Sequence, residues 1–211
     1  MVDVRFEVLC NGRVDLPALA ATGRRPAPFT PGAEFWTDPY RSERLLEAHL
    51  DETHGAASRP PDRIDADFGT FGPEDRRTVL DRVRTALGDD GYFAFDVLPT
   101  GALPDAERKT EWKLRGEAGE FWRPDPHLVL SASAAGPETA VALDQHLVVE
   151  PDGAATIYRF WQQHYSPEST ETLLSSCGFD LEGPFPDLQG GSGPGVEDEE
   201  LLGVVATVTS Q

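Results

Sequence analysis

Aromatic, histidine and arginine side chains concentrate between residues 112 and 165, and they are the side chains best suited to chemistry in this chain. An aromatic surface that also carries arginine can hold a small anionic or aromatic molecule through ring contacts and charge. The same residue types are common in ordinary sheet packing, which is the competing interpretation. The candidates for contacting such a molecule are Trp122, Arg159, Trp161 and Tyr165, and the candidate bases are His146 and His164.

Three predicted strands position most of these residues. Alternating or continuous apolar patterns indicate strands over residues 127–133, 140–150 and 155–163. Pro151-Asp152-Gly153 is typical of a tight turn between the last two, so we expect an antiparallel meander. Alternation along the third strand places Tyr158 and Phe160 on one face and Arg159 and Trp161 on the other.

The flanking segments predict helices and strands of an α/β fold. Pro73, Glu74 and Asp75 favour a helix start over residues 73–87, and a buried strand follows over residues 92–98. Ser166-Pro167-Glu168 predicts a helix that ends near Gly178, followed by strands over residues 179–185 and 201–208. A helix is also predicted over residues 40–50. The first 20 residues fit either a strand, from their alternation, or a helix.

Composition narrows the class of protein. The chain has 211 residues and a net charge of −19, a surface that would repel nucleic-acid phosphates. No run approaches the roughly 20 apolar residues of a membrane span, and no signal-peptide pattern opens the chain, so we expect a cytoplasmic protein without a membrane partner. Two cysteines do not form a disulfide framework, and five histidines without close ligand spacing predict no metal site.

Several sequence stretches, taken together, resemble one family. They include Phe35-Trp36-Thr37-Asp38-Pro39-Tyr40, Asp67-Phe68-Gly69 and Gly91-Tyr92-Phe93-Ala94-Phe95-Asp96-Val97. Further stretches are Gly119-Glu120-Phe121-Trp122-Arg123-Pro124-Asp125-Pro126-His127, Leu143-Asp144-Gln145-His146, Tyr158-Arg159-Phe160-Trp161 and Tyr165-Ser166-Pro167-Glu168. The chain is similar to class I S-adenosylmethionine-dependent methyltransferases, from about Pro26 to the C-terminus.

The resemblance implies a fold, a domain division and a cofactor. The fold is α/β, a partial Rossmann-like methyltransferase sheet with an antiparallel β insertion. Residues 1–65 correspond to an N-terminal helical or lid segment, and residues 66–211 to a shortened methyltransferase-like domain with the insertion at about 112–165. The implied cofactor is S-adenosylmethionine, and the residues that match its surroundings are Trp36, Tyr40, Arg59, Asp67, Phe68 and Gly69.

One part of the family pattern has no counterpart in this sequence. The glycine-rich cofactor-binding βαβ region is absent near Asp67, and the glycine-rich stretch at residues 190–195 follows no suitable strand. Two hypotheses therefore remain: a methyltransferase acting on a small molecule, with His146 or His164 as the base, or a non-catalytic module that binds a ligand or partner on the same scaffold. An exposed sheet edge, at the strand where the family sheet is cut short, favours a homodimer.

Overall fold

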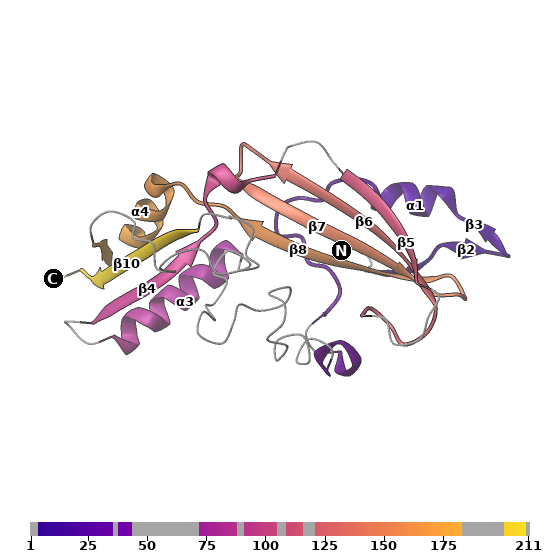
Figure 1. Cartoon of the computed structure of the whole chain (residues 1–211), viewed down its shortest axis with the longest axis horizontal. Coiled ribbons are helices and arrows are strands. Elements are labelled where there is room, and N and C mark those ends of the chain that lie inside the picture. The colour runs from indigo at the N-terminus through magenta and orange to yellow at the C-terminus, as the bar shows by residue number, and fades with distance from the viewer. Residues whose placement is uncertain are drawn as a thin grey trace, which may run out of the picture. The chain divides into compact units, whose positions relative to one another are not determined.

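The computed structural model describes residues 4–35, 38–43, 72–87, 91–104, 109–115, 121–182 and 201–209 (Figure 1). These residues fall into two compact units. The first contains the N-terminal segment together with most of a five-stranded sheet, and the second contains the remaining helices and a three-stranded sheet. The N-terminal segment thus groups with the β insertion, a division that differs from the boundary near residue 65 expected from the sequence.

The five-stranded sheet of the first unit has the order β1-β8-β7-β6-β5. Its strands are β1 (Arg5–Glu7), β5 (Lys109–Arg115), β6 (His127–Gly136), β7 (Val141–Val149) and β8 (Ala154–Gln163). The three strands predicted from the sequence are therefore confirmed. Four-residue connections join β6 to β7 and β7 to β8, as expected of hairpins in an antiparallel meander.

The turn between β7 and β8 forms where Pro151-Asp152-Gly153 predicts it. Gly153 has a φ of +92°, in the region that favours glycine, and its N–H donates to the Glu150 carbonyl at 2.9 Å. The Asp152 carboxylate accepts from the backbone N–H of Ala154 at 3.0 Å, which satisfies a donor at the start of β8.

Strand alternation gives the sheet two chemically different sides. One side, named here the Trp161 face, carries Ile157, Arg159 and Trp161 of β8. The opposite side, the Tyr158 face, carries Tyr158 and Phe160 of the same strand. This is the division that the sequence predicts for β8.

Part of the Trp161 face is covered by the N-terminal segment. Here β2 (Leu9–Cys10) and β3 (Arg13–Val14) form a hairpin, and α1 (Leu16–Thr22) follows it. Val8 and Leu19 pack against Leu147 and Ile157 in a small core. Asp15 begins α1 by accepting from the N–H of Ala18 at 3.0 Å. Both alternatives for the first 20 residues are thus realised in turn, because a strand precedes the helix.

The chain crosses from one sheet face to the other at Gly32. Before the crossing, Trp161 Nε1 donates to the Thr30 carbonyl at 2.9 Å on the Trp161 face. At the crossing, the N–H of Ala33 donates to the Ile157 carbonyl at 2.7 Å. After it, the ring of Phe35 lies 4.9 Å from that of Phe160 on the Tyr158 face. A Cβ on Gly32 would lie 2.5 Å from the backbone nitrogen of Arg159, so only glycine fits this close approach.

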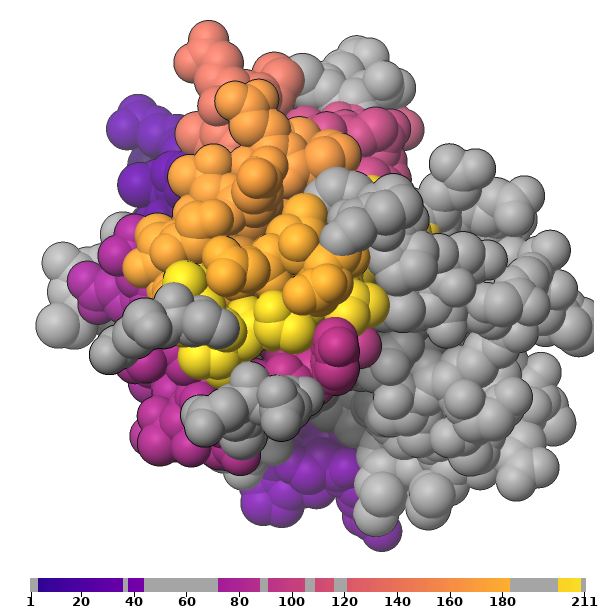
Figure 2. Space-filling model, turned by 90° about the vertical axis from the view of Figure 1, so that its left-hand side faces the viewer, coloured from indigo at the N-terminus to yellow at the C-terminus, as the bar shows by residue number. Residues whose placement is uncertain are grey.

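The second unit is built around a three-stranded antiparallel sheet with the order β4-β10-β9. The strands are β4 (Tyr92–Val97), β9 (Phe179–Leu181) and β10 (Leu202–Val208), and a short 3₁₀ turn, η3 (Thr100–Ala102), follows β4. In Figure 2 the yellow of β10 lies between the orange of the preceding C-terminal elements and the magenta of α3 and β4. The predicted strand over residues 179–185 is observed as far as Leu181, and residues 183–185 lie outside the described residues.

Two helices, α3 (Pro73–Ala86) and α4 (Pro167–Ser176), pack with this sheet, in agreement with the sequence. Their Leu80 and Leu174 side chains join Phe95, Phe179 and Val204 in one buried core. Ser166 caps α4 by accepting from the N–H of Ser169 at 3.1 Å, and the Ser169 hydroxyl accepts from the N–H of Ser166. The unit is therefore held by helix–sheet packing of a mixed α/β type.

The strand pairings differ in direction from those of a doubly wound sheet. Every pair of named strands with a recorded register is antiparallel, and the parallel contact among the described residues is a single bridge between Pro99 and Tyr165. The fold is thus mixed α/β with mostly antiparallel sheets. The parallel half implied by the family resemblance is not represented in the described part of the chain.

The crossing at Gly32 generates a prediction about stability. We expect Gly32→Ala to lower the free energy of unfolding by about 3 kcal/mol, because the new Cβ meets rigid backbone rather than a movable side chain. Gly101→Ala is the control, since a Cβ there meets nothing within 4 Å. Urea unfolding followed by tryptophan fluorescence measures both. Equal unfolding midpoints in the two variants would contradict the assigned role of Gly32.

Candidate functional site

The structure separates the six candidate side chains named from the sequence. Trp122 and His146 lie together at the Tyr158 face, with ring centroids 4.9 Å apart. Arg159 and Trp161 lie on the opposite face of the same sheet. His164 and Tyr165 follow β8 and belong to the second unit. One of the predicted substrate residues and one of the predicted bases therefore meet.

His146 sits where a polar pair and an aromatic pair of side chains adjoin. Its Nδ1 lies 2.9 Å from the Ser131 hydroxyl, on the neighbouring strand β6. Trp122 covers the ring on one side, and the Phe160 centroid lies 5.7 Å away. We call Trp122, Ser131, His146 and Phe160 the His146 cluster. The half-buried His146 ring thus has one nitrogen engaged, and no described residue hydrogen-bonds Nε2.

Burial and charge act on the His146 ring in opposite directions. Burial lowers the pKa of His146 from its ordinary value, and the nearby carboxylates of Asp144 and Glu111 oppose that shift. Asp144 is itself held by the Ser133 hydroxyl, which donates to it at 2.5 Å. The net lowering of the pKa keeps the ring neutral near pH 7, the state in which an unprotonated nitrogen can accept a proton.

A buried cation lies beside this cluster on the same face. Arg41 is 4% exposed, and its guanidinium carbon lies 4.6 Å from the centroid of the Tyr158 ring and 5.4 Å from that of Phe35. It donates to the Tyr158 hydroxyl at 2.8 Å and pairs with the Asp38 carboxylate at 3.2 Å. Because its charge is paired within the chain, we assign Arg41 to anchoring residues 38–43 onto the sheet.

Arg159 and Trp161 act as anchors for the connector that precedes Gly32. Arg159 donates to the Gln145 side chain at 2.9 Å and to the Pro31 carbonyl at 2.6 Å. Burial lowers the pKa of Arg159, which remains a cation at neutral pH. Trp161 is buried, with its ring 5.8 Å from Phe29. Both side chains use their donors on the chain's own backbone, which leaves little with which to bind a ligand.

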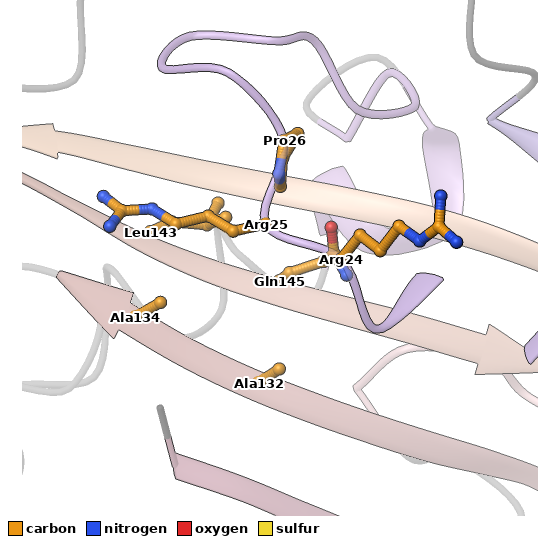
Figure 3. A pocket seen from close by; sticks show the side chains of 7 residues that line it. All are labelled: Arg24, Arg25, Pro26, Ala132, Ala134, Leu143 and Gln145. Atoms are coloured by element: carbon orange, nitrogen blue, oxygen red, sulfur yellow. The ribbon is translucent and has the colours of Figure 1, made fainter. Parts of the chain in front are cut away.

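A small pocket lies near these anchors on the Trp161 face. Figure 3 shows the guanidinium groups of Arg24 and Arg25 pointing away from each other above the pocket. The other lining residues are Pro26, Ala132, Ala134, Leu143 and Gln145. Its volume of about 10 Å³ has room for one water molecule, so this pocket does not hold a small-molecule substrate.

His164 and Tyr165 are structural residues of the second unit. His164 is 3% exposed; its Nδ1 lies 3.0 Å from the Pro99 carbonyl, and its Nε2 is buried without a hydrogen-bond partner among the described residues. The Tyr165 hydroxyl accepts a hydrogen bond from buried Arg76. Burial raises the pKa of Tyr165, and the charge of Arg76 opposes the rise. The geometry therefore favours His146 over His164 as a base that a substrate can reach.

Tyr40 is the one predicted cofactor residue that the structure describes, and it is half-buried in the helical segment after Asp38. Trp36, Arg59, Asp67, Phe68 and Gly69 lie outside the described residues. Within the described ranges, the glycines stand singly in the sequence, and no pair of them forms a cradle for close approach of a cofactor. The described residues alone therefore do not form the cofactor site that the resemblance implies.

Sequence reasoning missed Ser131 and Phe160, two of the four members of the His146 cluster. Their signal was present in the alternation of β6 and β8, which places Ser131 and Phe160 on one face. The pairing that brings β6, β7 and β8 into register is required to show that these residues meet. The described residues include no group of three or more His, Cys, Asp or Glu that could hold a metal ion. No helix among them is both long and apolar enough to cross a membrane.

Comparisons with known proteins give a distant similarity. The sequence matches no protein-family model, and no curated protein matches it. The CcbJ methyltransferase from Streptomyces caelestis shares 16% identity over 68% of this chain and 53% of its own, with a TM-score of 0.42. An S-adenosylmethionine-dependent methyltransferase from Clostridium acetobutylicum ATCC 824 shares 12% identity over 65% and 52%, with a TM-score of 0.41.

A third structure, the amino pentose methyltransferase CalS10 from Micromonospora echinaspora, was solved with S-adenosylmethionine bound. It shares 14% identity over 67% of this chain and 54% of its own, with a TM-score of 0.36. This chain spans about half the length of each of the three structures. The similarity to S-adenosylmethionine-dependent methyltransferases is thus distant and partial.

The electrostatics of His146 give a testable pH dependence. We expect the ring to titrate below the ordinary value of about 6.5, and Asp144→Asn to lower the pKa further by removing a carboxylate that raises it. Because the folded-state pKa is depressed, the ring's contribution to stability is fully present above the unfolded-state pKa and is lost as the pH falls through the folded-state value. NMR titration of the ring measures the shift.

Glu138→Gln, in the exposed turn after β6, is the matched control and should leave the His146 titration unchanged. A His146 pKa above the ordinary value, or one that rises in Asp144→Asn, would contradict the assigned balance of burial and charge.

Proposed function

We propose that this protein is an S-adenosylmethionine-dependent methyltransferase that acts on a small molecule, with the acceptor bound at the His146 cluster. The observation that carries the proposal is the geometry of His146. Its ring is held at Nδ1 by Ser131, flanked by Trp122 and Phe160, kept neutral by burial, and has no hydrogen-bond partner at Nε2 among the described residues. The sequence resemblance to class I methyltransferases supplies the reaction class.

The side chains of the cluster have distinct roles in this proposal. Trp122 and Phe160 provide ring surfaces against which a small aromatic or flat molecule packs and from which water is excluded. Ser131 fixes the orientation and tautomer of the imidazole through Nδ1. Nε2 of His146 then accepts the proton that an acceptor N–H or O–H loses as it becomes a nucleophile. S-Adenosylmethionine, when bound, supplies the methyl group.

Placement also bears on the acceptor's charge. Asp144 and Glu111 act on the His146 ring as carboxylates, whereas Arg159, which the sequence suggested for an anionic substrate, is engaged on the opposite face. The charge near His146 therefore favours a neutral or cationic acceptor over an anionic one. This proposal replaces the anion-binding role suggested by the arginine-bearing strand.

A second function is favoured by the sequence itself. The glycine-rich cofactor region has no counterpart in the chain, and the described glycines stand singly. A module that binds a small molecule at the His146 cluster without S-adenosylmethionine would need none of that region. The two functions differ in one observable property, because the second predicts ligand binding that S-adenosylmethionine does not alter.

The proposed base is tested by chemical rescue. With methyl-labelled S-adenosylmethionine and a panel of small amine and hydroxyl acceptors, we expect His146→Ala to lower the rate of labelled product formation about 10²- to 10⁴-fold, because the proton acceptor is lost. Added imidazole should restore part of the rate in this variant and not in His146→Gln, whose side chain fills the space.

A purely structural role would give a different result. Loss of rate without rescue, in a variant that folds as the wild type by circular dichroism, would contradict the role of His146 as a base. Failure of the wild-type protein to label any acceptor in the panel would favour the ligand-binding module instead.

A further inference from the structure

Strand β5 forms an exposed edge of the five-stranded sheet. It is the last strand in the sheet order and pairs with β6, from Lys109 opposite Ser133 to Arg115 opposite His127. Six of its seven residues are exposed, with only Arg115 partly covered. An uncovered edge strand presents backbone N–H and C=O groups that another strand can pair with. This edge is separate from the His146 cluster and plays no part in the proposed reaction.

The two sides of β5 differ in chemistry. On the Trp161 face, Trp112 and Leu114 are 72% and 71% exposed. These are the two most exposed large apolar side chains among those that the structure describes. On the Tyr158 face the strand carries Lys109, Glu111, Lys113 and Arg115. Large apolar side chains that project beside an unpaired strand edge are typical of an interaction surface.

The charges on β5 contrast with those of the whole chain. Lys109 and Lys113 are the only lysines in a chain whose net charge is −19. Glu111 lies between them, and its carboxylate is 2.9 Å from the Lys113 ammonium group. Lysines on an edge strand oppose pairing with strands that lack matching acidic groups. A strand that places a carboxylate opposite one of these lysines would instead be accepted.

We propose that β5 pairs with β5 of a second copy of this chain, antiparallel about a two-fold axis at Trp112. In this register Glu111 of each copy lies opposite Lys113 of the other, and the two Trp112 side chains lie opposite each other. Opposite charges and aromatic pairs across a strand pair are both stabilising. The interface is self-complementary, as two-fold symmetry requires.

Other registers match the side chains less well. Parallel pairing in register would place each charge opposite an identical charge. An antiparallel axis at Glu111 would oppose two glutamates, and an axis at Lys113 would oppose two lysines at its centre. With the axis at Trp112, like charges meet only at the strand ends, where Lys109 lies opposite Arg115 and both long side chains can turn into solvent.

The dimer is tested with the full chain by light scattering between about 10 and 200 μM, a range suited to a small interface of one strand pair. We expect the mass of two chains at the upper end. Trp112→Lys should abolish the dimer, and Glu111→Lys should weaken the association about tenfold, as the loss of two cross-strand ion pairs implies. Glu111→Lys combined with Lys113→Glu should restore it, because each new lysine again meets a glutamate.

The matched control is Tyr92→Lys, which adds the same charge to β4, an edge strand of the other sheet, at an aromatic residue that is 68% exposed. It should leave the dimer unchanged. A single-chain mass at every concentration would overturn the proposal. A dimer that survives Trp112→Lys, one that is lost in Tyr92→Lys, or a charge-swapped double variant that stays as weak as Glu111→Lys would overturn it as well. Circular dichroism of each variant verifies that it folds.

Discussion

The close passage of the backbone at Gly32 over β8 is the constraint on which the first unit depends. Residues before the crossing are held on the Trp161 face by hydrogen bonds from Arg159 and Trp161. Residues after it bring Phe35 and Arg41 onto the Tyr158 face. The crossing needs a residue without a Cβ, because the neighbouring backbone lies 2.5 Å from where that atom would be. One glycine thus divides the chemically capable side chains into anchors on one face and a candidate site on the other.

This division explains why similar residues along one strand have different roles. Arg159 and Trp161 are consumed in holding the connector, and Tyr158 is consumed in pairing with Arg41. Phe160 remains beside His146 and Trp122, where the ring of His146 is oriented by Ser131 and has a nitrogen without a partner among the described residues. A buried polar group that is oriented but not fully engaged is suited to binding or proton transfer rather than to stability alone. The His146 cluster is therefore the strongest candidate for function in the first unit.

The sequence predicted the local elements better than the long-range ones. Strands β6, β7 and β8 and helices α3 and α4 follow from short-range alternation, turn residues and caps, which act over a few positions. Strand β5 was missed because its four charged residues obscure the alternation of Thr110, Trp112 and Leu114. The choice between His146 and His164 needed tertiary contacts, because neither burial nor the partner at Nδ1 follows from the local sequence. The crossing at Gly32 joins residues more than 100 positions apart, which no local pattern encodes.

Isothermal titration of the purified protein with S-adenosylmethionine and with S-adenosylhomocysteine tests the central claim most directly. The titration is made at low and at high salt, because an acidic chain of net charge −19 changes its surface electrostatics with screening. The account predicts heat of binding with micromolar affinity for both molecules. No heat with either molecule at either salt, from protein that is folded by circular dichroism, would contradict the methyltransferase function and leave a ligand-binding module on a related scaffold.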